Sequence, residues 1–391
     1  KWLPLLLFMS TALFAKSQPK PDIRSQMKLA LQQYQALLAA HPDITQTPHS
    51  FANGKYVDKP ADWWCSGFFA GNLWFLYQYT YDEQWKTAAD KWTRAVEQEQ
   101  YNTGTHDLGF MLYCSFGNGY RLTGNPLYKQ VLLQGAKSLA TRFNPKSGVI
   151  KSWDRFGQYD YPVIIDNMMN LEFLLWAAKA SGLSRYYDIA VSHADVTMKN
   201  HYRPDHSSYH VVCYDSVGNV LAKKTAQGAN DTSAWARGQA WGLYGFTVMY
   251  RETKDKKYLQ QAKDIADFFI HHPNLPADKI PYWDFNAPNI PNEERDAAAG
   301  AIACSALLEL YRYVGKDKAK EYFDVAEKML TSLSGPDYRS ALGENGNFLI
   351  KHCVSSKPGG QDVDAPLIYA DYYYLEALLR YDKALFAEPS H

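Results

Sequence analysis

Three polar clusters in the sequence combine side chains that could transfer protons and hold an anion. Two of them place an aspartate beside another polar residue, as His106-Asp107 and Asp166-Asn167. The third, residues 225–242, contains Arg237. Two carboxyl groups kept at different pKa values provide one acid that donates a proton near neutrality, the usual equipment of glycoside cleavage. A guanidinium pairs well with a carboxylate. The clusters therefore predict acid–base chemistry on an acidic sugar.

Each aspartate also has a simpler interpretation, because Asp at a helix start accepts hydrogen bonds from unpaired backbone N–H groups. Two features favour the catalytic interpretation. Asp107 and Asp166 both precede apolar helices of the inner type, so a toroid would bring them to one cavity. Each also adjoins a second polar side chain, His106 or Asn167, which capping does not require.

The third cluster carries two tryptophans close to the arginine. On a helix Arg237 and Trp241 lie at i and i+4 on one face, with Trp235 about half a turn away. One interpretation is an arginine that binds a substrate carboxylate between rings against which a sugar lies. The other is an interior arginine paired with a core carboxylate, with the tryptophans as packing. Aromatic residues make up 15% of the chain, which suits either.

The elements that must position these clusters are mostly helical. An apolar helix ends near Gly or Lys-Asp and another follows at once, which predicts a short turn between paired helices. This junction recurs at residues 121–136, 180–194, 251–266 and 311–329, and more loosely at 79–92. Long inserts precede the inner helices near 95–106, 143–165, 201–233 and 273–295. The best strand signal, residues 209–216, predicts a short hairpin in a loop.

Irregular repeat intervals argue against a solenoid, whereas the loops at one rim of a toroid lengthen freely to build a site. No linker divides the chain. We therefore expect an all-α, six-hairpin (α/α)6 barrel that forms a single catalytic domain over residues 19–391.

Composition and charge exclude several classes. Lys+Arg and Asp+Glu both number 41, so no global basic field would recruit nucleic acid or an anionic membrane. Residues 1–18 are typical of a secretory signal peptide, which predicts export to a bacterial periplasm and no membrane span in the mature protein. The five scattered cysteines form neither a disulfide framework nor a metal-site spacing. Nucleotide and dinucleotide fingerprints are missing from the sequence, so we expect no metal and no cofactor.

The clusters resemble, in order and spacing, the unsaturated glucuronyl hydrolase family, glycoside hydrolase family 88, which has an (α/α)6 barrel. The similarity runs from about Trp63 to Tyr381. Its motifs are WCSGFF from Trp64, HDLGF from His106, IDNMMNLE from Ile165, TAQG from Thr225, SAWARGQAWGLYG from Ser233 and DYYYLEA from Asp371. The SAWARGQAWGLYG block is the most specific of these.

The resemblance implies roles for individual residues. Asp166 would be the general acid and then base, with Asp107 its partner across the cavity. The residues expected to bind the unsaturated uronic acid are His210, Gln227, Arg237 and Trp241, with Trp64 and Trp235 stacking around it. Adjacency adds His106 and Asn167 to the binding residues.

A further element, Ser355-Ser356-Lys357, is similar to one with which some family members hold a sulfate on the second sugar. It can equally be an exposed polar turn before Pro358-Gly359-Gly360. In the first case Ser355 and Lys357 bind substrate, and sulfated disaccharides of the chondroitin type are favoured.

The implied substrate is an acidic oligosaccharide whose terminal uronic acid carries the C4=C5 double bond left by a polysaccharide lyase. Its release by hydration of that bond needs no cofactor. Three alternatives stay open: an unsaturated rhamnogalacturonyl hydrolase acting on pectin fragments, a sugar isomerase or epimerase, and a non-catalytic carbohydrate-binding protein. The isomerase chemistry normally needs a histidine pair that the sequence does not supply.

Overall fold

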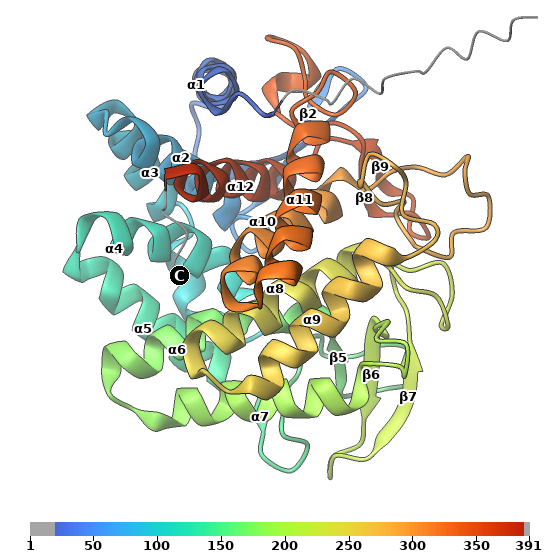
Figure 1. Ribbon diagram of the computed structural model, residues 1–391. Coiled ribbons are helices and arrows are strands. Elements are labelled where there is room, and N and C mark those ends of the chain that lie inside the picture. The colour runs from blue at the N-terminus through green and yellow to red at the C-terminus, as the bar shows by residue number, and fades with distance from the viewer. Residues whose placement is uncertain (1–19, 387–391) are drawn as a thin grey trace, which may run out of the picture.

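The computed structural model describes residues 20–386 and is mainly helical (Figure 1). The predicted signal peptide, residues 1–18, lies outside the described residues. Within residues 20–386 no helix combines the length and the apolar character needed to cross a bilayer. All five cysteines are buried free thiols, as their spacing predicts.

Three helices are buried around their whole circumference for most of their length. They are α2 (Gly67–Thr80), α8 (Ala236–Thr253) and α10 (Ala297–Leu310). Helices that are apolar all round belong in the interior. The inner row is continued by η2 (Gly109–Gly117), α4 (Asn118–Thr123), η3 (Ile165–Asn170), α6 (Leu171–Ser181) and α12 (Ile368–Phe386).

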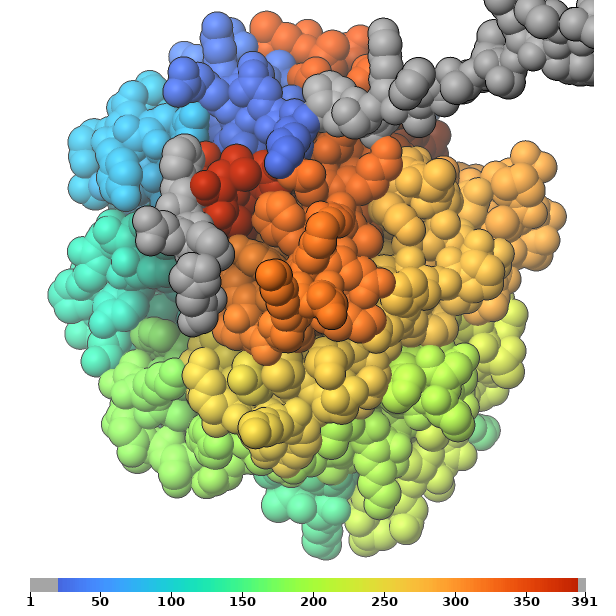
Figure 2. All heavy atoms as spheres, in the orientation of Figure 1, coloured from blue at the N-terminus to red at the C-terminus, as the bar shows by residue number. Residues whose placement is uncertain are grey.

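The remaining long helices bury a single face. In α9 (Lys256–His271) the buried positions Tyr258, Ala262, Ile265 and Phe269 recur every three or four residues, which is the period of a helix packed on one side. The other outer helices are α1 (Ile23–Ala40), α3 (Glu83–Arg94), α5 (Pro126–Ala140), α7 (Ser184–Asn200) and α11 (Lys316–Leu333). Figure 2 shows the face on which α9 and α11, in yellow and orange, cover the inner helices.

The recurring junction in the sequence is a tight αα-turn with matched caps. At Lys254-Asp255 the lysine adopts the left-handed conformation with φ 61°, and the Asp255 side chain accepts a hydrogen bond from the N–H of Lys257. Gly124-Asn125 repeats the arrangement with φ 67° and an acceptor for the next helix. A left-handed residue ends one helix and an N-cap starts another, so the chain reverses within two residues.

Successive inner helices pack side by side, and the last of them returns to the first. α8 packs on α10, α10 on α12, and α12 on α2, while α3, α7, α9 and α11 each pack against the inner helix before them in sequence. At the join the Tyr34 hydroxyl of α1 donates to the Asp371 carboxylate of α12 across 2.9 Å, and Asn72 of α2 donates to the same hydroxyl. Helices from both ends of the chain therefore share one buried polar contact.

Strands are more numerous than the sequence predicts, although all of them are short. The expected hairpin is present as β6 (Val211–Tyr214) and β7 (Val220–Lys224), and β5 (Pro162–Ile164) extends it to three strands. Three further hairpins were not expected: β1 (Gln46–Ala52) with β2 (Lys55–Pro60), β3 (Phe143–Asn144) with β4 (Val149–Ile150), and β8 (Cys353–Ser356) with β9 (Gln361–Ala365). Each sheet lies in a segment that precedes an inner helix, so the strands gather where those helices begin.

Candidate active site

The two aspartate clusters lie side by side, fastened by a pair of asparagines. The backbone N–H of Gly109 at the start of η2 donates to Asn170 Oδ1 across 2.9 Å. Asn170 Nδ2 in turn donates to Asn167 Oδ1 across 2.8 Å. Segments far apart in the sequence are thereby held in register, and Asp107 and Asp166 are brought together as predicted from the converging helix starts.

Asn167 is fully buried and its amide is engaged with the protein. Its Nδ2 donates to the carbonyl of Ile150 at 2.7 Å and to Ser152 Oγ at 3.0 Å, while its Oδ1 accepts from Asn170. These contacts fix the turn that carries Asp166. A direct contact of Asn167 with substrate stays a prediction.

Asp107 does not cap a helix with its side chain. Its carboxylate accepts a hydrogen bond from the Thr105 hydroxyl at 2.9 Å, and His106 Nε2 lies 3.3 Å from its other oxygen. His106 is completely buried, and neither of its ring nitrogens has a hydrogen-bond partner. Burial lowers the pKa of this imidazole, although the Asp107 charge opposes the effect.

Asp166 is the carboxyl group whose surroundings suit proton donation. Its Oδ2 is buried and has no hydrogen-bond partner. Desolvation raises the pKa of Asp166 to about 7, and repulsion from Asp107 adds to the rise, while attraction to Arg237 opposes it. A carboxyl group with this pKa is partly protonated at neutrality and can serve as acid and then as base.

His210 faces Asp166 in a defined tautomer. Its Nδ1 accepts hydrogen bonds from the backbone N–H groups of Ala226 and Gln227, at 3.1 and 3.2 Å. Since Nδ1 is an acceptor, the proton of the neutral ring lies on Nε2. That nitrogen is 3.7 Å from Asp166 Oδ2. Burial, and then the Arg237 charge, hold the pKa of His210 well below its ordinary value, so the ring is a neutral donor.

Arg237 has the core carboxylate partner that one of its two sequence interpretations predicts, whereas binding of a substrate carboxylate stays a prediction. It forms a buried ion pair with Asp296 at 2.6 Å, and it also donates to the backbone carbonyls of Val354 and Ser355. Its guanidinium lies 4.4 Å from the centre of the Trp235 ring. The arginine is therefore an interior residue paired with a core carboxylate, and its charge also acts on Asp166.

Asp296 was not found by reasoning from the sequence. Its Oδ1 accepts hydrogen bonds from the N–H groups of Ala298 and Ala299, so it caps α10, and its Oδ2 receives Arg237. An aspartate before the run Ala297-Ala298-Ala299 is a readable cap signal. Its arginine partner has no local signal, because it lies on the preceding inner helix.

Gln227 and the Ser355–Lys357 element meet at the β8 strand. Gln227 Nε2 donates to the Ser355 carbonyl across 2.8 Å, the same oxygen that accepts from Arg237. Lys357 is paired with Glu294, and the Ser356 hydroxyl accepts from the Gly359 N–H in the turn that follows. The element is a strand and a turn. Its backbone borders the site, whereas sulfate binding by Ser355 and Lys357 stays a prediction.

Aromatic rings pack around these groups. Trp64 lies 5.0 Å from Tyr369 and 5.4 Å from Phe110, measured between ring centres. Trp241 is fully buried against Phe110 and Tyr373, so it lies under the site instead of forming an open stacking surface.

Two of the aromatic rings around the site have no neighbouring motif in the sequence that would assign them to it. Trp153, in the insert before β5, lies 6.1 Å from His210, and Tyr369 lies 5.7 Å from the Arg237 guanidinium. Sequence reasoning missed both, because only the fold brings them to the site.

The site concentrates buried polar atoms that lack partners. Buried polar groups are nearly always hydrogen-bonded, so a cluster of exceptions needs an explanation. The unpaired atoms are both ring nitrogens of His106, Asp166 Oδ2, His210 Nε2, Trp241 Nε1 and the Tyr369 hydroxyl. Donors and acceptors held in this way fit a ligand that carries both, such as the hydroxyls and carboxylate of an acidic sugar.

Comparison with known proteins identifies the family. The model of Glycosyl Hydrolase Family 88 matches residues 42–384. The chain belongs to glycoside hydrolase family 88. The assignment made from the sequence motifs is thus confirmed, and the non-catalytic alternative is disfavoured.

Individual relatives agree with this assignment. An unsaturated glucuronyl hydrolase from Formosa agariphila is 46% identical over 325 residues, which cover 82% of this chain and 80% of that protein. A crystal structure of an unsaturated glucuronyl hydrolase specific for heparin is 45% identical, with a TM-score of 0.91 over 94% of this chain and 99% of that one. A mutant enzyme from Streptococcus agalactiae complexed with dGlcA-GalNAc6S is 28% identical, with a TM-score of 0.79 over 94% and 93%.

Proposed function

We propose that this family 88 enzyme is an unsaturated glucuronyl hydrolase acting on lyase-generated glycosaminoglycan fragments. It removes the terminal 4,5-unsaturated uronic acid. The observation that carries the proposal is Asp166, a carboxyl group with a pKa raised to about 7 and a free buried oxygen, beside the neutral donor His210. The names of the relatives support this class of substrate over pectin fragments.

The geometry suits hydration of a vinyl ether. Protonated Asp166 delivers its proton to C4, and the positive charge develops at C5, stabilised by the ring oxygen. Asp166, now ionised, takes a proton from a water molecule that adds to C5. The resulting hemiketal opens, the bond to the next sugar breaks, and the leaving oxygen is protonated. One carboxyl group thus performs both transfers.

The surrounding residues set the state of Asp166 and receive the sugar. Asp107 repels the ionised form of Asp166 and so keeps the acid protonated near neutrality. His210 Nε2–H is an unpaired donor for the substrate carboxylate, and the nearby Arg237 charge attracts that anion. Trp64 is partly exposed and supplies a face for the sugar ring. Trp235 is buried against His210 and Arg237, so stacking of the sugar on it stays a prediction.

The fold supports the same assignment. We take the six helix pairs, with α12 packed on both α10 and α2, to form the (α/α)6 toroid of the family. The segments that precede inner helices then form one rim. This arrangement explains why residues that precede different inner helices reach a common site.

The test follows the ultraviolet absorbance of the C4=C5 bond. Unsaturated chondroitin, heparin and rhamnogalacturonan disaccharides are supplied side by side, both to the wild type and to Asp166→Asn. We expect loss of absorbance with glycosaminoglycan substrates and almost none in the variant, which still binds them. Hydrolysis by the variant at near wild-type rate would contradict the role of Asp166, and preference for rhamnogalacturonan would contradict the substrate class.

A further inference from the structure

A second hollow lies between α4, α6 and α12, and Asp166 does not line it. Its volume is about 510 Å³, within the range typical of small-molecule sites. Its walls come from α2, η2, α4, α6, α8 and α12. Asp107, Asp166, His210 and Arg237 do not line it, although Gly109, Phe110 and Tyr373 border both the active site and this cavity.

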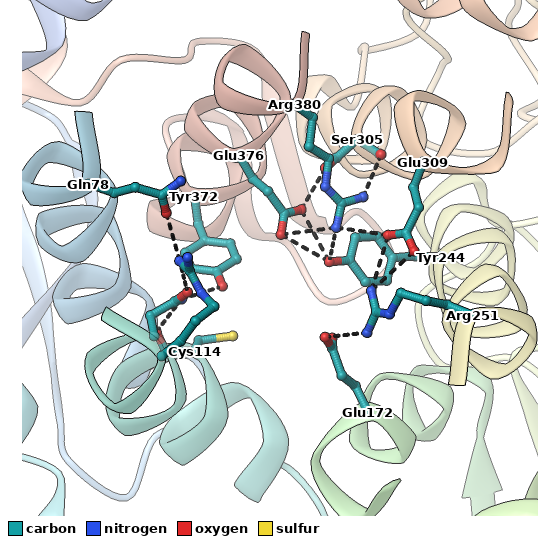
Figure 3. Close-up of polar contacts among 12 residues, drawn as sticks. Gln78, Cys114, Glu172, Tyr244, Arg251, Ser305, Glu309, Tyr372, Glu376 and Arg380 are labelled. Atoms are coloured by element: carbon teal, nitrogen blue, oxygen red, sulfur yellow. Dashed lines mark hydrogen bonds and ion pairs between the residues drawn. The ribbon is translucent and has the colours of Figure 1, made fainter. Parts of the chain in front are cut away.

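Glu172, Glu376 and Arg380 line the cavity. They belong to a chain of charged side chains, which Figure 3 shows running across α6, α8, α10 and α12. Arg380 contacts Glu376 at 3.3 Å and Glu309 at 3.2 Å, and Arg251 links Glu309 at 3.2 Å to Glu172 at 2.6 Å. Each of these side chains has at most 26% of its surface exposed. Burying so many charges costs free energy that hydrophobic packing would not, so stability alone does not explain the network.

Two cations that line the cavity, Arg121 on α4 and Lys383 on α12, have no carboxylate partner within the described residues. Arg121 Nη2 donates to Gln78 Oε1 at 2.7 Å and to Asn118 Oδ1 at 2.9 Å, and both of these acceptors are uncharged amides. Lys383 also lines the hollow, and it forms no ion pair within residues 20–386. The cavity therefore offers two positive charges to an anion, one from α4 and one from α12.

Aromatic rings complete the lining of the cavity. Trp176 lies 6.1 Å from Tyr113 and 5.7 Å from Tyr120, ring centre to ring centre, and all three line the cavity. Such rings present faces to the C–H groups of a sugar, and their hydroxyl or N–H groups add hydrogen bonds.

We propose that this cavity is a second ligand site, which binds an acidic sugar. The carboxylate pairs with Arg121 and Lys383, the ring lies against Trp176, and a sugar hydroxyl donates to Glu172, of which one oxygen is held by Arg251. The class of ligand follows from the cavity itself. Only the expectation that the sugar is a substrate or product of this enzyme rests on the proposed function.

The test uses D-glucuronate, a saturated sugar acid that the enzyme cannot hydrate, with D-glucose as the uncharged probe. Binding to the full chain is followed by tryptophan fluorescence and ligand-observed NMR. We expect saturable binding of glucuronate that weakens at least about tenfold in Arg121→Gln, because a charge-assisted contact is lost. Glucose should bind correspondingly weakly.

Matched variants locate the site. Arg94→Gln removes an exposed arginine that pairs with Asp90 on α3, and it should leave glucuronate binding unchanged. Arg237→Lys alters the active site and should likewise leave the second site intact. No saturable binding in the wild type, or binding abolished by Arg237→Lys but unaffected by Arg121→Gln, would overturn the proposal.

Whether the second site binds substrate or product is determined from the number of sugar molecules bound per chain in the Asp166→Asn variant. Two equivalents of unsaturated disaccharide bound per chain indicate substrate in the second site. One equivalent, with separate saturable binding of the released uronic acid, indicates product. Arg121→Gln should hydrolyse the unsaturated disaccharide at the wild-type rate, because Asp166 is unchanged. A loss of sugar binding in this variant therefore reports on the second site and not on the proposed catalytic function.

Discussion

Arg237 and Asp296 form an ion pair at 2.6 Å in which neither side chain exposes more than 2% of its surface. The two residues start neighbouring inner helices, α8 and α10. The same arginine also holds the carbonyls of β8, so one guanidinium joins two helices and a hairpin beside Asp166. The geometry of the site therefore depends on a carboxylate that need not touch substrate.

Replacing Asp296 by Asn should destabilise the protein by about 3–5 kcal/mol, because the buried arginine loses its counter-charge. The asparagine of this variant can still cap α10 with its side-chain oxygen, so the loss of stability measures the removal of the ion pair with Arg237. Urea unfolding measures the loss. The exposed pair Lys320–Asp324 supplies the control: Asp324→Asn should cost less than about 1 kcal/mol. Equal effects of the two substitutions would refute the argument.

Activity should fall as the pH rises through about 7, since Asp166 must be protonated to deliver the first proton and its pKa lies near that value. Above the pKa, kcat/KM should drop about tenfold per pH unit. Initial rates over a range of buffers, followed by ultraviolet absorbance, provide the profile. A rate that is constant from pH 6 to pH 9, on the order of three units, would assign the acid elsewhere.

The same pKa predicts an effect on stability. A carboxyl group with a raised folded-state pKa contributes stability at low pH, and this contribution is lost as the pH rises through the folded pKa. Asp166→Asn should therefore be more stable than the wild type above pH 7, by up to about 4 kcal/mol. The difference should vanish near pH 4, on the order of the unfolded pKa.

Thermal unfolding at several pH values measures this difference. Asp371, whose pKa burial also raises to about 7, leaves a residual slope of the same sign in both proteins. A variant less stable than the wild type above pH 7 would show that the ionised Asp166 is not the destabilising form.

An asparagine should replace His210 as an acceptor of backbone hydrogen bonds, but not as the donor that faces Asp166. Asn at this position keeps an oxygen near the place of Nδ1, where it can accept from the Ala226 and Gln227 N–H groups. It loses the Nε2–H that faces Asp166. We expect kcat/KM of His210→Asn to fall about 100-fold, the scale for loss of one active-site donor, with unfolding little changed. Steady-state kinetics and circular dichroism separate the two effects.

Gly109 is needed because two segments approach closely at this point. A Cβ there would lie 2.6 Å from Asn170 Oδ1 and 3.1 Å from the Asn170 Cα. Gly109→Ala should separate η2 from η3, destabilise the fold by about 1–3 kcal/mol and lower kcat more than it raises KM. Gly315→Ala, where no atom lies within 4 Å, should do neither.

Much of the site could be read from the sequence because its residues sit at helix starts, which composition marks. Asp107, Asp166 and Arg237 follow long inserts and open apolar helices, so a toroid predicts their convergence. The structure adds contacts that side-chain identity does not encode. The Ser355 carbonyl holds both Gln227 and Arg237, and any residue there would present the same oxygen.

The helical pairs were predictable for a similar reason, whereas the short hairpins were not. The two residues Lys254-Asp255 predict a helix end in the left-handed conformation followed by the N-cap of the next helix. The strands β8 and β9 are four and five residues long and show no clear alternation of apolar and polar side chains. The sequence therefore does not predict them as strands. Trp153 and Tyr369 were missed because their neighbours in space are distant in sequence.

The bond between Tyr34 and Asp371 spans 337 positions of the chain, and this separation constrains how the protein reaches its native state. A nascent chain that lacks α12 leaves the apolar flanks of α2 and α10 uncovered, so these contacts cannot form before α12 has been synthesised. Contacts with such large sequence separation slow folding. Until α12 packs between them, the apolar surfaces of α2 and α10 stay exposed to solvent.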